Sequence, residues 1–363
     1  MPTLFDPIQL GAIAAPNRIL MAPLTRGRSE PVHVPISTLK AEYYSQRAAA
    51  GLLIAEATGI SQEGLGWPSA PGIWSDEQVA AWQPVTQAVH DAGGRIILQL
   101  WHMGRLVHPD FLSGAQPVSS SDTTAPGSAH TPTGKKPYES ARALQLAEIP
   151  RVIADYVRAA KNAIRAGFDG VQIHSANGYL IDQFLRDNTN FRTDEYGGPI
   201  DSRIRLLREV TQAVADAVGA DRTSVRLSPN GETQGADDSN PVALFTAAAA
   251  ALHDIGIAFL ELREQKPFGG FGTTEVPRVS PDIRKVFPGP LILNQEYNLE
   301  RAEADLASGL ADGISFGRPF ISNPDLVERL RVDAPFVPDN FKTWYSAGPE
   351  GYTDYPTLAQ EAA

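Results

Sequence analysis

Residues 147–174 read AEIPRVIADYVRAAKNAIRAGFDGVQIH, and the pattern within them repeats along the chain. Residues 147–166 carry the 3.6-residue apolar period of a helix, and Gly167 follows where a left-handed C-cap residue is favoured. Residues 171–174 are one of eight short runs in the chain, most of which are apolar on consecutive positions, as in strands buried on both faces of a parallel sheet. The stretch therefore predicts a helix that packs against a parallel strand.

Short apolar runs and helical patterns alternate eight times. The other predicted strands are residues 19–22, 52–57, 96–100, 224–227, 258–262, 291–293 and 313–316. The other predicted helices are residues 37–50, 76–92, 200–218, 241–255, 281–287, 299–308 and 324–331. Eight βα units favour one α/β domain over residues 1–363, a single (β/α)8 TIM barrel. A doubly wound sheet is the alternative, disfavoured because the turn after the first run, APLTRGRS, lacks G-x-G-x-x-G.

The third repeat contains a long excursion, about residues 105–145, which is rich in Ser, Thr, Pro and Gly. It follows a predicted barrel strand on the face where barrel active sites lie. Tyr138 and Leu144 give it apolar groups to bury. We therefore expect a covering lobe rather than a loose insertion.

Composition excludes several classes of function. The net charge of −11 disfavours nucleic acid as a partner, because phosphate backbones repel an acidic protein. The absence of cysteine excludes disulfides, thiolate metal sites and Cys nucleophiles. No apolar stretch reaches about 18 residues, and the N-terminus does not read as a signal peptide. We expect a cytoplasmic protein without membrane contact.

The predicted strand ends are rich in neutral and cationic donors and poor in carboxylates. Glu261 stands almost alone, no Lys ends a strand, and H-E-x-x-H is absent from the sequence. Metal-assisted hydrolysis, two-carboxylate mechanisms and Schiff-base chemistry are therefore disfavoured. The remaining Thr, Gln, His, Asn, Tyr and Arg side chains suit binding of an electron-rich heterocycle and polarisation of a carbonyl.

The fourth strand end reads HSANGYLIDQFLRDNTNFRTDEYGG, residues 174–198. His174 and Asn177 lie three residues apart at a strand-to-turn junction, so both can donate hydrogen bonds to one carbonyl oxygen. Tyr179 follows, and a phenol with a pKa of about 10 can deliver a proton while staying neutral at pH 7. The three residues together predict a catalytic cluster rather than a packed core histidine.

This segment resembles the hallmark region of the Old Yellow Enzyme family of flavin-dependent ene-reductases. Further matches are NRILMAPLTR, EATGISQEGLG, QLWHMGR, SFGRPFISNPDL and GYTDYPTL, and they extend over nearly the whole chain. The resemblance implies non-covalent FMN at the strand C-termini of one barrel. It implies that NAD(P)H, with NADPH favoured, reduces the flavin, which passes hydride to the β-carbon of enones, enals or maleimides. Tyr179 would protonate the α-carbon.

The resemblance also implies roles for individual residues. His174 and Asn177 would hold the substrate carbonyl. Thr25 would contact the flavin carbonyl beside N5, Gln99 the pyrimidine edge, and Arg226 the N1 and O2 atoms. The remaining implied cofactor contacts are Ala22, Pro23, Ala57, Asn294, Gly317 and Arg318, with Gly317 and Arg318 at the phosphate. The implied substrate-pocket residues are Trp67, Trp101, Tyr345 and Arg142, with Arg142 near the nicotinamide entrance.

Two features of the sequence depart from the family pattern. LILNQEYN, residues 291–298, stands where many members have a glycine-richer loop, and Trp67 stands where relatives often carry Tyr. Two other functions stay open: a flavin-free barrel isomerase or aldolase that binds a phosphorylated substrate at Arg318, and a non-catalytic flavin carrier or interaction barrel. We expect a monomer or a weak homo-oligomer.

Overall fold

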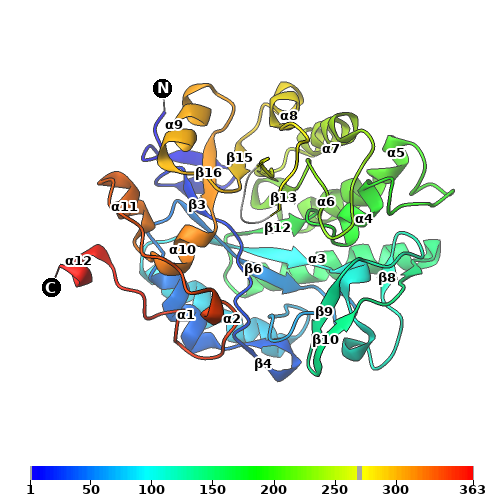
Figure 1. Cartoon of the computed structure of the whole chain (residues 1–363), viewed down its shortest axis with the longest axis horizontal. Coiled ribbons are helices and arrows are strands. Elements are labelled where there is room, and N and C mark those ends of the chain that lie inside the picture. Colours follow the sequence, from blue (N-terminus) through cyan, green and yellow to red (C-terminus); the bar gives the residue numbers. More distant parts are fainter. Residues whose placement is uncertain (1, 268–271, 363) are drawn as a thin grey trace.

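The computed structural model describes residues 2–267 and 272–362, and its centre is a closed barrel of eight strands (Figure 1). Around the barrel, the order is β12 (Gly170–His174), β13 (Thr223–Leu227), β14 (Phe259–Arg263), β15 (Leu291–Asn294), β16 (Gly313–Phe316), β3 (Ile19–Met21), β6 (Leu52–Gly59) and β7 (Ile96–Trp101). Every neighbouring pair is parallel. The predicted (β/α)8 barrel is confirmed.

Helices surround the barrel and bury their apolar faces against it. They include α1 (Ser37–Ser45), α2 (Asp76–Asp91), α3 (Ile149–Arg165), α6 (Arg205–Val218), α7 (Pro241–Ile255), α8 (Ser280–Val286), α9 (Leu299–Ala307) and α11 (Leu326–Arg331). The helix expected over 200–218 is interrupted at Ile204, which separates α5 (Ile200–Arg203) from α6. Among the described residues, no helix has both the length and the apolarity needed to cross a membrane.

Several short elements carry too little periodicity to be predicted from the sequence. The short α-helices are α4 (Leu180–Leu185), α10 (Arg318–Ser322) and α12 (Leu358–Glu361). Short 3-10 turns occur at Pro31–His33, Gly104–Leu106, Pro109–Phe111, Leu146–Glu148, Ala220–Arg222 and Phe341–Thr343. A small antiparallel pair joins β4 (Ser29–Glu30) to β5 (Val34–Pro35). Both α4 and α10 follow barrel strands and so belong to the functional end.

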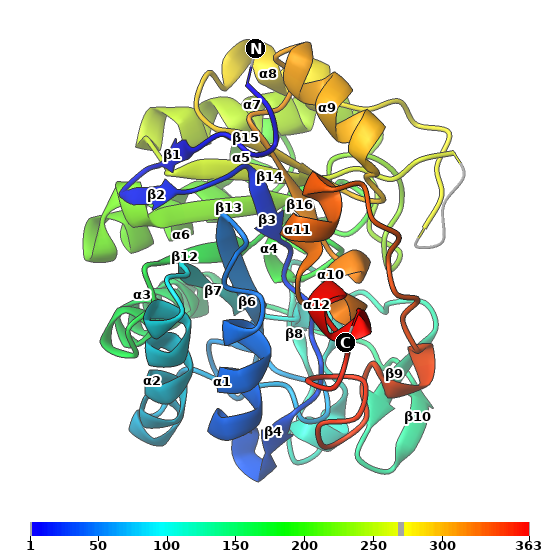
Figure 2. The same ribbon diagram turned by 90° about the vertical axis from the view of Figure 1, so that its left-hand side faces the viewer.

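An N-terminal hairpin packs against the opposite end of the barrel, where the strands begin (Figure 2). Its strands β1 (Ile8–Leu10) and β2 (Ile13–Ala15) share one buried cluster with Leu20, Leu52 and Phe259. Gly11 turns the hairpin with a φ of +59°, and a Cβ there would lie 2.1 Å from the Asp221 carbonyl oxygen. The approach of hairpin and barrel therefore requires glycine.

The excursion over residues 105–145 is ordered by two small sheets. β8 (Val118–Ser119) pairs in parallel with β11 (Arg142–Ala143), and β9 (Ser128–Thr131) forms an antiparallel hairpin with β10 (Gly134–Pro137). Leu144 is buried in the main core, and Tyr138 packs against a second apolar cluster that contains Trp101. The excursion therefore buries the two apolar groups singled out in the sequence.

Candidate active site

A cavity of about 650 Å³ opens at the C-terminal ends of the barrel strands. The size is typical of sites that hold a small molecule or a cofactor. The predicted site residues that line it are Ala22, Pro23, Thr25, Ala57, Trp67, Gln99, Trp101, His174, Asn177, Tyr179, Arg226, Asn294, Gly317, Arg318 and Tyr345. Residues from β3, β6, β7 and β12 to β16 thus meet in one place, because parallel strands end at the same side of a barrel.

Arg142 is the predicted pocket residue that does not line this cavity, so its place near the nicotinamide entrance stays a prediction. It belongs to β11 in the excursion and is not among the residues that line the cavity. Its guanidinium forms a bidentate ion pair with Glu148, with both N–O distances at 2.7 Å. The neighbouring Glu63 carboxylate lies 4.0 Å away. The sequence could not show that these acidic groups hold the side chain outside the cavity.

Near the C-terminal ends of the barrel strands, the buried carboxylate of Glu261 neutralises the buried guanidinium of Arg226. Glu261 on β14 accepts hydrogen bonds from Arg226 Nη1 at 2.9 Å, from Gln172 Nε2 at 2.9 Å and from the Ser315 hydroxyl. The Glu261 side chain is fully buried and that of Arg226 is 6% exposed. Glu261, which stood almost alone among the strand-end residues, therefore has a structural role as the counterion of Arg226.

The amides of Gln99 and Asn294 belong to the same hydrogen-bonded layer. Gln99 Nε2 donates to Gln172 Oε1 at 2.8 Å. Asn294 Oδ1 accepts from Arg226 Nη2 at 2.8 Å, and its Nδ2 donates to the Ser315 carbonyl at 2.8 Å. Both polar atoms of Asn294 are thus engaged in holding Arg226 and β16. An amide nitrogen carries two N–H groups, so these bonds do not occupy the whole side chain, and the cofactor contact that the resemblance implies for Asn294 stays a prediction.

The catalytic candidates form an aromatic group at the end of β12. The His174 and Tyr179 rings meet edge-on with centroids 4.8 Å apart, and Trp101 meets Tyr179 at 5.0 Å. Burial, with Arg226 and Arg263 nearby, holds the pKa of His174 well below its ordinary value, so the imidazole is neutral. Burial raises the pKa of Tyr179, so its phenol keeps its proton at neutral pH.

The turn after β12 fixes the position of Asn177. Its φ of +59° is left-handed, a conformation that asparagine tolerates better than most residues. Its backbone N–H donates to Ser228 Oγ at 2.8 Å, and its carbonyl accepts from Gln234 Nε2 at 2.8 Å. Its side-chain Oδ1 accepts from Arg263 Nη1 at 3.0 Å. Backbone and side chain are therefore held by separate partners.

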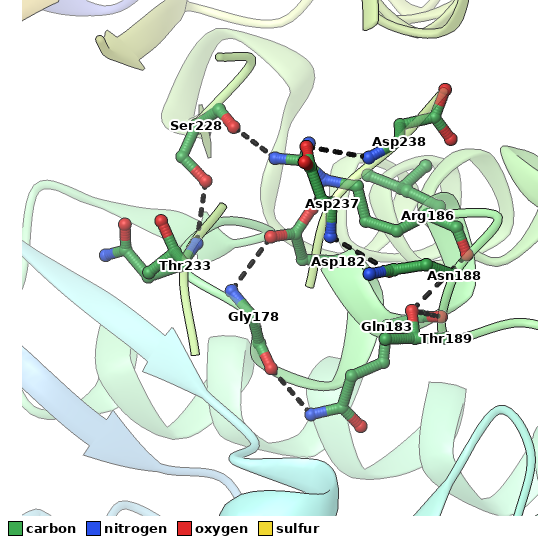
Figure 3. A network of polar contacts seen from close by, with 12 residues as sticks. Gly178, Asp182, Gln183, Arg186, Asn188, Thr189, Ser228, Thr233, Asp237 and Asp238 are labelled. Atoms are coloured by element: carbon green, nitrogen blue, oxygen red, sulfur yellow. Dashed lines mark hydrogen bonds and ion pairs between the residues drawn. The ribbon is translucent and has the colours of Figure 1, made fainter. Parts of the chain in front are cut away.

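A buried polar network contacts this turn through Gly178 (Figure 3). The Gly178 N–H donates to Asp182 Oδ2 at 2.8 Å, and the Gly178 carbonyl accepts from Gln183 Nε2 at 2.7 Å. Asp182 also accepts from Arg186 Nε at 2.9 Å, and both side chains of this ion pair are fully buried. Removing one member would leave a buried charge or donor without its partner, so the network makes the turn rigid.

Sequence reasoning missed Arg263, which also lines the cavity. The apolar run predicted a strand that ended at residue 262, whereas β14 continues through Arg263. A strand-end arginine was a signal of the same kind as Arg226, but the predicted boundary lay one residue too early. Gln295 and Lys266, from the following loops, line the same wall and were likewise missed.

The donor chemistry of the cavity fits a flavin mononucleotide. Buried nitrogens without a hydrogen-bond partner occur at Trp101 Nε1, His174 Nδ1 and Arg226 Nε. Thr25 lines the same cavity and carries a hydroxyl group. Buried donors beside a cavity need acceptors, and a flavin ring offers carbonyl oxygens and ring nitrogens. Within the described residues, no group of three or more His, Asp or Glu could hold a metal ion.

Comparisons with known proteins agree with this geometry. Residues 3–335 match the model of the NADH:flavin oxidoreductase / NADH oxidase family. The chain is 43% identical to a putative 12-oxophytodienoate reductase from Oryza sativa subsp. japonica, over 99% of this chain and 98% of the relative. The crystal structure of the old yellow enzyme homologue from Zymomonas mobilis is 62% identical, with a TM-score of 0.97 over 98% of this chain and 100% of the other.

Morphinone reductase in complex with tetrahydroNAD is 44% identical, with a TM-score of 0.93 over 99% of this chain and 98% of the other. The chain belongs to the NADH:flavin oxidoreductase / NADH oxidase family and, within it, to the Old Yellow Enzymes. It is an NAD(P)H-dependent flavin oxidoreductase. Membership implies FMN as the cofactor and a nicotinamide nucleotide as the reductant.

Proposed function

We propose that this oxidoreductase is an ene-reductase that reduces the C=C bond of enones, enals and maleimides with NAD(P)H, NADPH being favoured. The observation that carries the proposal is the meeting of a neutral His174, the Asn177 carboxamide and the Tyr179 phenol on one cavity wall. Two neutral donors beside a proton donor suit an activated alkene, because its carbonyl gains negative charge while its α-carbon needs a proton. The similarity to a putative 12-oxophytodienoate reductase and to morphinone reductase supports this class.

The residues that would hold FMN come from several strand ends. Thr25 and Gln99 offer a hydroxyl and an amide to the ring, Arg226 offers a cation, and Gly317 and Arg318 stand at the start of α10 for the phosphate. When bound, FMN supplies the two-electron chemistry by which the reductant and the alkene exchange a hydride. The aromatic rings of Trp101 and Tyr179 exclude water from that wall of the cavity.

The chain's own residues bind, polarise and protonate the substrate. His174 and Asn177 donate hydrogen bonds to the carbonyl oxygen and stabilise the enolate-like charge that develops there. Tyr179, whose raised pKa keeps its proton in place, delivers that proton to the α-carbon. Net addition of one hydride and one proton converts the alkene to the saturated carbonyl compound.

We also propose that the excursion over residues 105–145 is a covering lobe. The His130 ring on β9 lies 5.2 Å from Trp67, and Trp67 lies 5.4 Å from Tyr345. Both Trp67 and Tyr345 line the cavity. The tip of the excursion therefore borders the pocket wall, where it is placed to shield bound substrate from water.

Replacement of both donors tests the proposed function. The variant with His174→Ala and Asn177→Ala should lower NADPH-driven reduction of 2-cyclohexenone by about 10³-fold or more, since one oxyanion donor is worth about 10²–10³ in kcat. Its FMN content should stay that of the wild type. His253→Ala, exposed on α7, is the matched control and should change neither quantity. Unchanged turnover in the double variant would refute the assigned roles.

A further inference from the structure

Arg263 faces the proposed catalytic amide from the end of β14. The residue is 7% exposed and lines the same cavity as His174 and Asn177. Its Nη1 donates to Asn177 Oδ1 at 3.0 Å, and its Nε donates to Gln295 Oε1 at 3.0 Å. Two directional hydrogen bonds from one planar group fix the orientation of the guanidinium.

The chemistry of a guanidinium determines which end of the Asn177 carboxamide faces it. Arginine carries five N–H donors and no acceptor, so the atom 3.0 Å from Nη1 must be the amide oxygen. An inverted amide would set N–H groups against each other. Burial and the nearby Arg226 lower the pKa of Arg263 to about 10, which still leaves the group charged at neutral pH. The Asn177 Nδ2 group is therefore directed away from Arg263.

The backbone of Asn177 is held without any help from Arg263. Its N–H is bonded to Ser228 and its carbonyl to Gln234, both at 2.8 Å. Among the described residues, no acceptor pairs with Asn177 Nδ2, although the residue lines the cavity. What Arg263 adds is control over the rotation of the amide group alone.

We propose that Arg263 is a positioning residue that locks the Asn177 amide with its NH2 group toward the substrate, a proposal that rests on the proposed function. With its amide held in this orientation, Asn177 can only donate hydrogen bonds into the cavity. The pocket therefore selects ligands that accept hydrogen bonds, such as carbonyl compounds, and disfavours ligands that donate them. Without the hydrogen bond from Arg263, the Asn177 amide can turn either its oxygen or its NH2 group toward the ligand.

Ligand binding to the FMN-loaded protein tests the lock through two small probes. Cyclopentanone only accepts hydrogen bonds and pyrrole only donates one, and binding of each can be followed by the change in flavin absorbance. Arg263→Met should raise the Kd of cyclopentanone about tenfold, equivalent to about 1.4 kcal/mol, while the Kd of pyrrole stays the same or falls. Arg263→Lys, which keeps a donor, should restore most of the preference for the ketone.

The same Arg263 substitution in an Asn177→Ala protein distinguishes a positioning role of Arg263 from a purely structural one. In Asn177→Ala protein, Arg263→Met should leave the Kd of cyclopentanone unchanged, because no amide remains to be oriented. Equal losses in both backgrounds, or parallel losses for ketone and pyrrole, would overturn the proposal. If Arg263→Met fails to retain FMN, Arg263→Gln takes its place. The glutamine amide can pair with either the oxygen or the NH2 group of Asn177, so it should also weaken the preference for the ketone. Wild-type protein that binds the ketone but does not reduce 2-cyclohexenone would contradict the proposed function instead.

Discussion

Removing the charge of Glu261 should destabilise the barrel strongly. Glu261 receives hydrogen bonds from three donors, among them Arg226 at 2.9 Å, and the ion pair is almost completely buried. Glu261→Gln keeps the volume of the side chain but offers one oxygen in place of two. Its new NH2 group would face donors, and Arg226 would become a buried cation without its counterion.

The expected magnitude follows from the burial of the pair. Breaking a buried ion pair by removing one partner costs about 3–5 kcal/mol, because the remaining charge stays desolvated. With an m-value of about 3 kcal/mol/M in urea, the unfolding midpoint should fall by about 1 M or more. Adding Arg226→Met to Glu261→Gln removes the stranded charge. The double variant should therefore be more stable than Glu261→Gln alone.

Urea unfolding of the FMN-stripped protein, followed by tryptophan fluorescence, measures these differences without the stabilisation that bound FMN would add. Glu303→Gln, an exposed change on α9, is the control and should shift the free energy of unfolding by less than about 0.5 kcal/mol. Equal effects of Glu261→Gln and Glu303→Gln would refute the reasoning. So would a double variant whose destabilisation is the sum of two separate losses.

Three further predictions concern the catalytic cluster and the C-terminal wall of the cavity. The pKa of His174 is lowered in the native state, so as pH falls below about 6.5 only the unfolded state gains this proton and the protein becomes less stable. His174→Gln should therefore reduce the pH dependence of the free energy of unfolding by about 1.4 kcal/mol per pH unit, measured by urea unfolding between pH 6 and 5. Tyr179→Phe should lower kcat for 2-cyclohexenone about 10²-fold at constant FMN content, and an unchanged kcat would assign the proton to solvent. Arg28, which is buried and donates to the carbonyls of Thr343, Trp344, Gly348 and Glu350, ties down the segment that carries Tyr345; Arg28→Met should speed proteolysis of this segment, whereas the exposed Arg331→Met should not.

The barrel was predictable because its signal is repeated. Most of the strands, such as residues 19–22 and 291–293, are apolar on consecutive positions, and helical patterns alternate with them along the chain. The hairpin of β1 and β2 was not predictable, because strands of three residues carry no measurable alternation. The short helices α4 and α10 were not predictable either, because five or six residues are too few to show a helical period.

The candidate site was predictable where strand ends fix the position of a side chain. His174, Gln99 and Arg226 all reach the cavity because a parallel barrel brings their strand ends together. The position of Arg142 outside the cavity lining was not predictable, because it depends on the pairing of β11 with β8 and on an ion pair with Glu148. Such contacts are tertiary and leave no local pattern. The role of Asn294 was likewise hidden, since it depends on a partner 68 residues away.

An anaerobic titration tests the central claim most directly, namely that a flavin lies in this cavity beside His174 and Asn177. The purified protein should show flavin absorbance, NADPH should bleach it, and 2-cyclohexenone should restore it with one equivalent of saturated ketone formed per flavin. Protein that cannot be loaded with FMN, or a bleached flavin that the enone fails to reoxidise, would contradict the account.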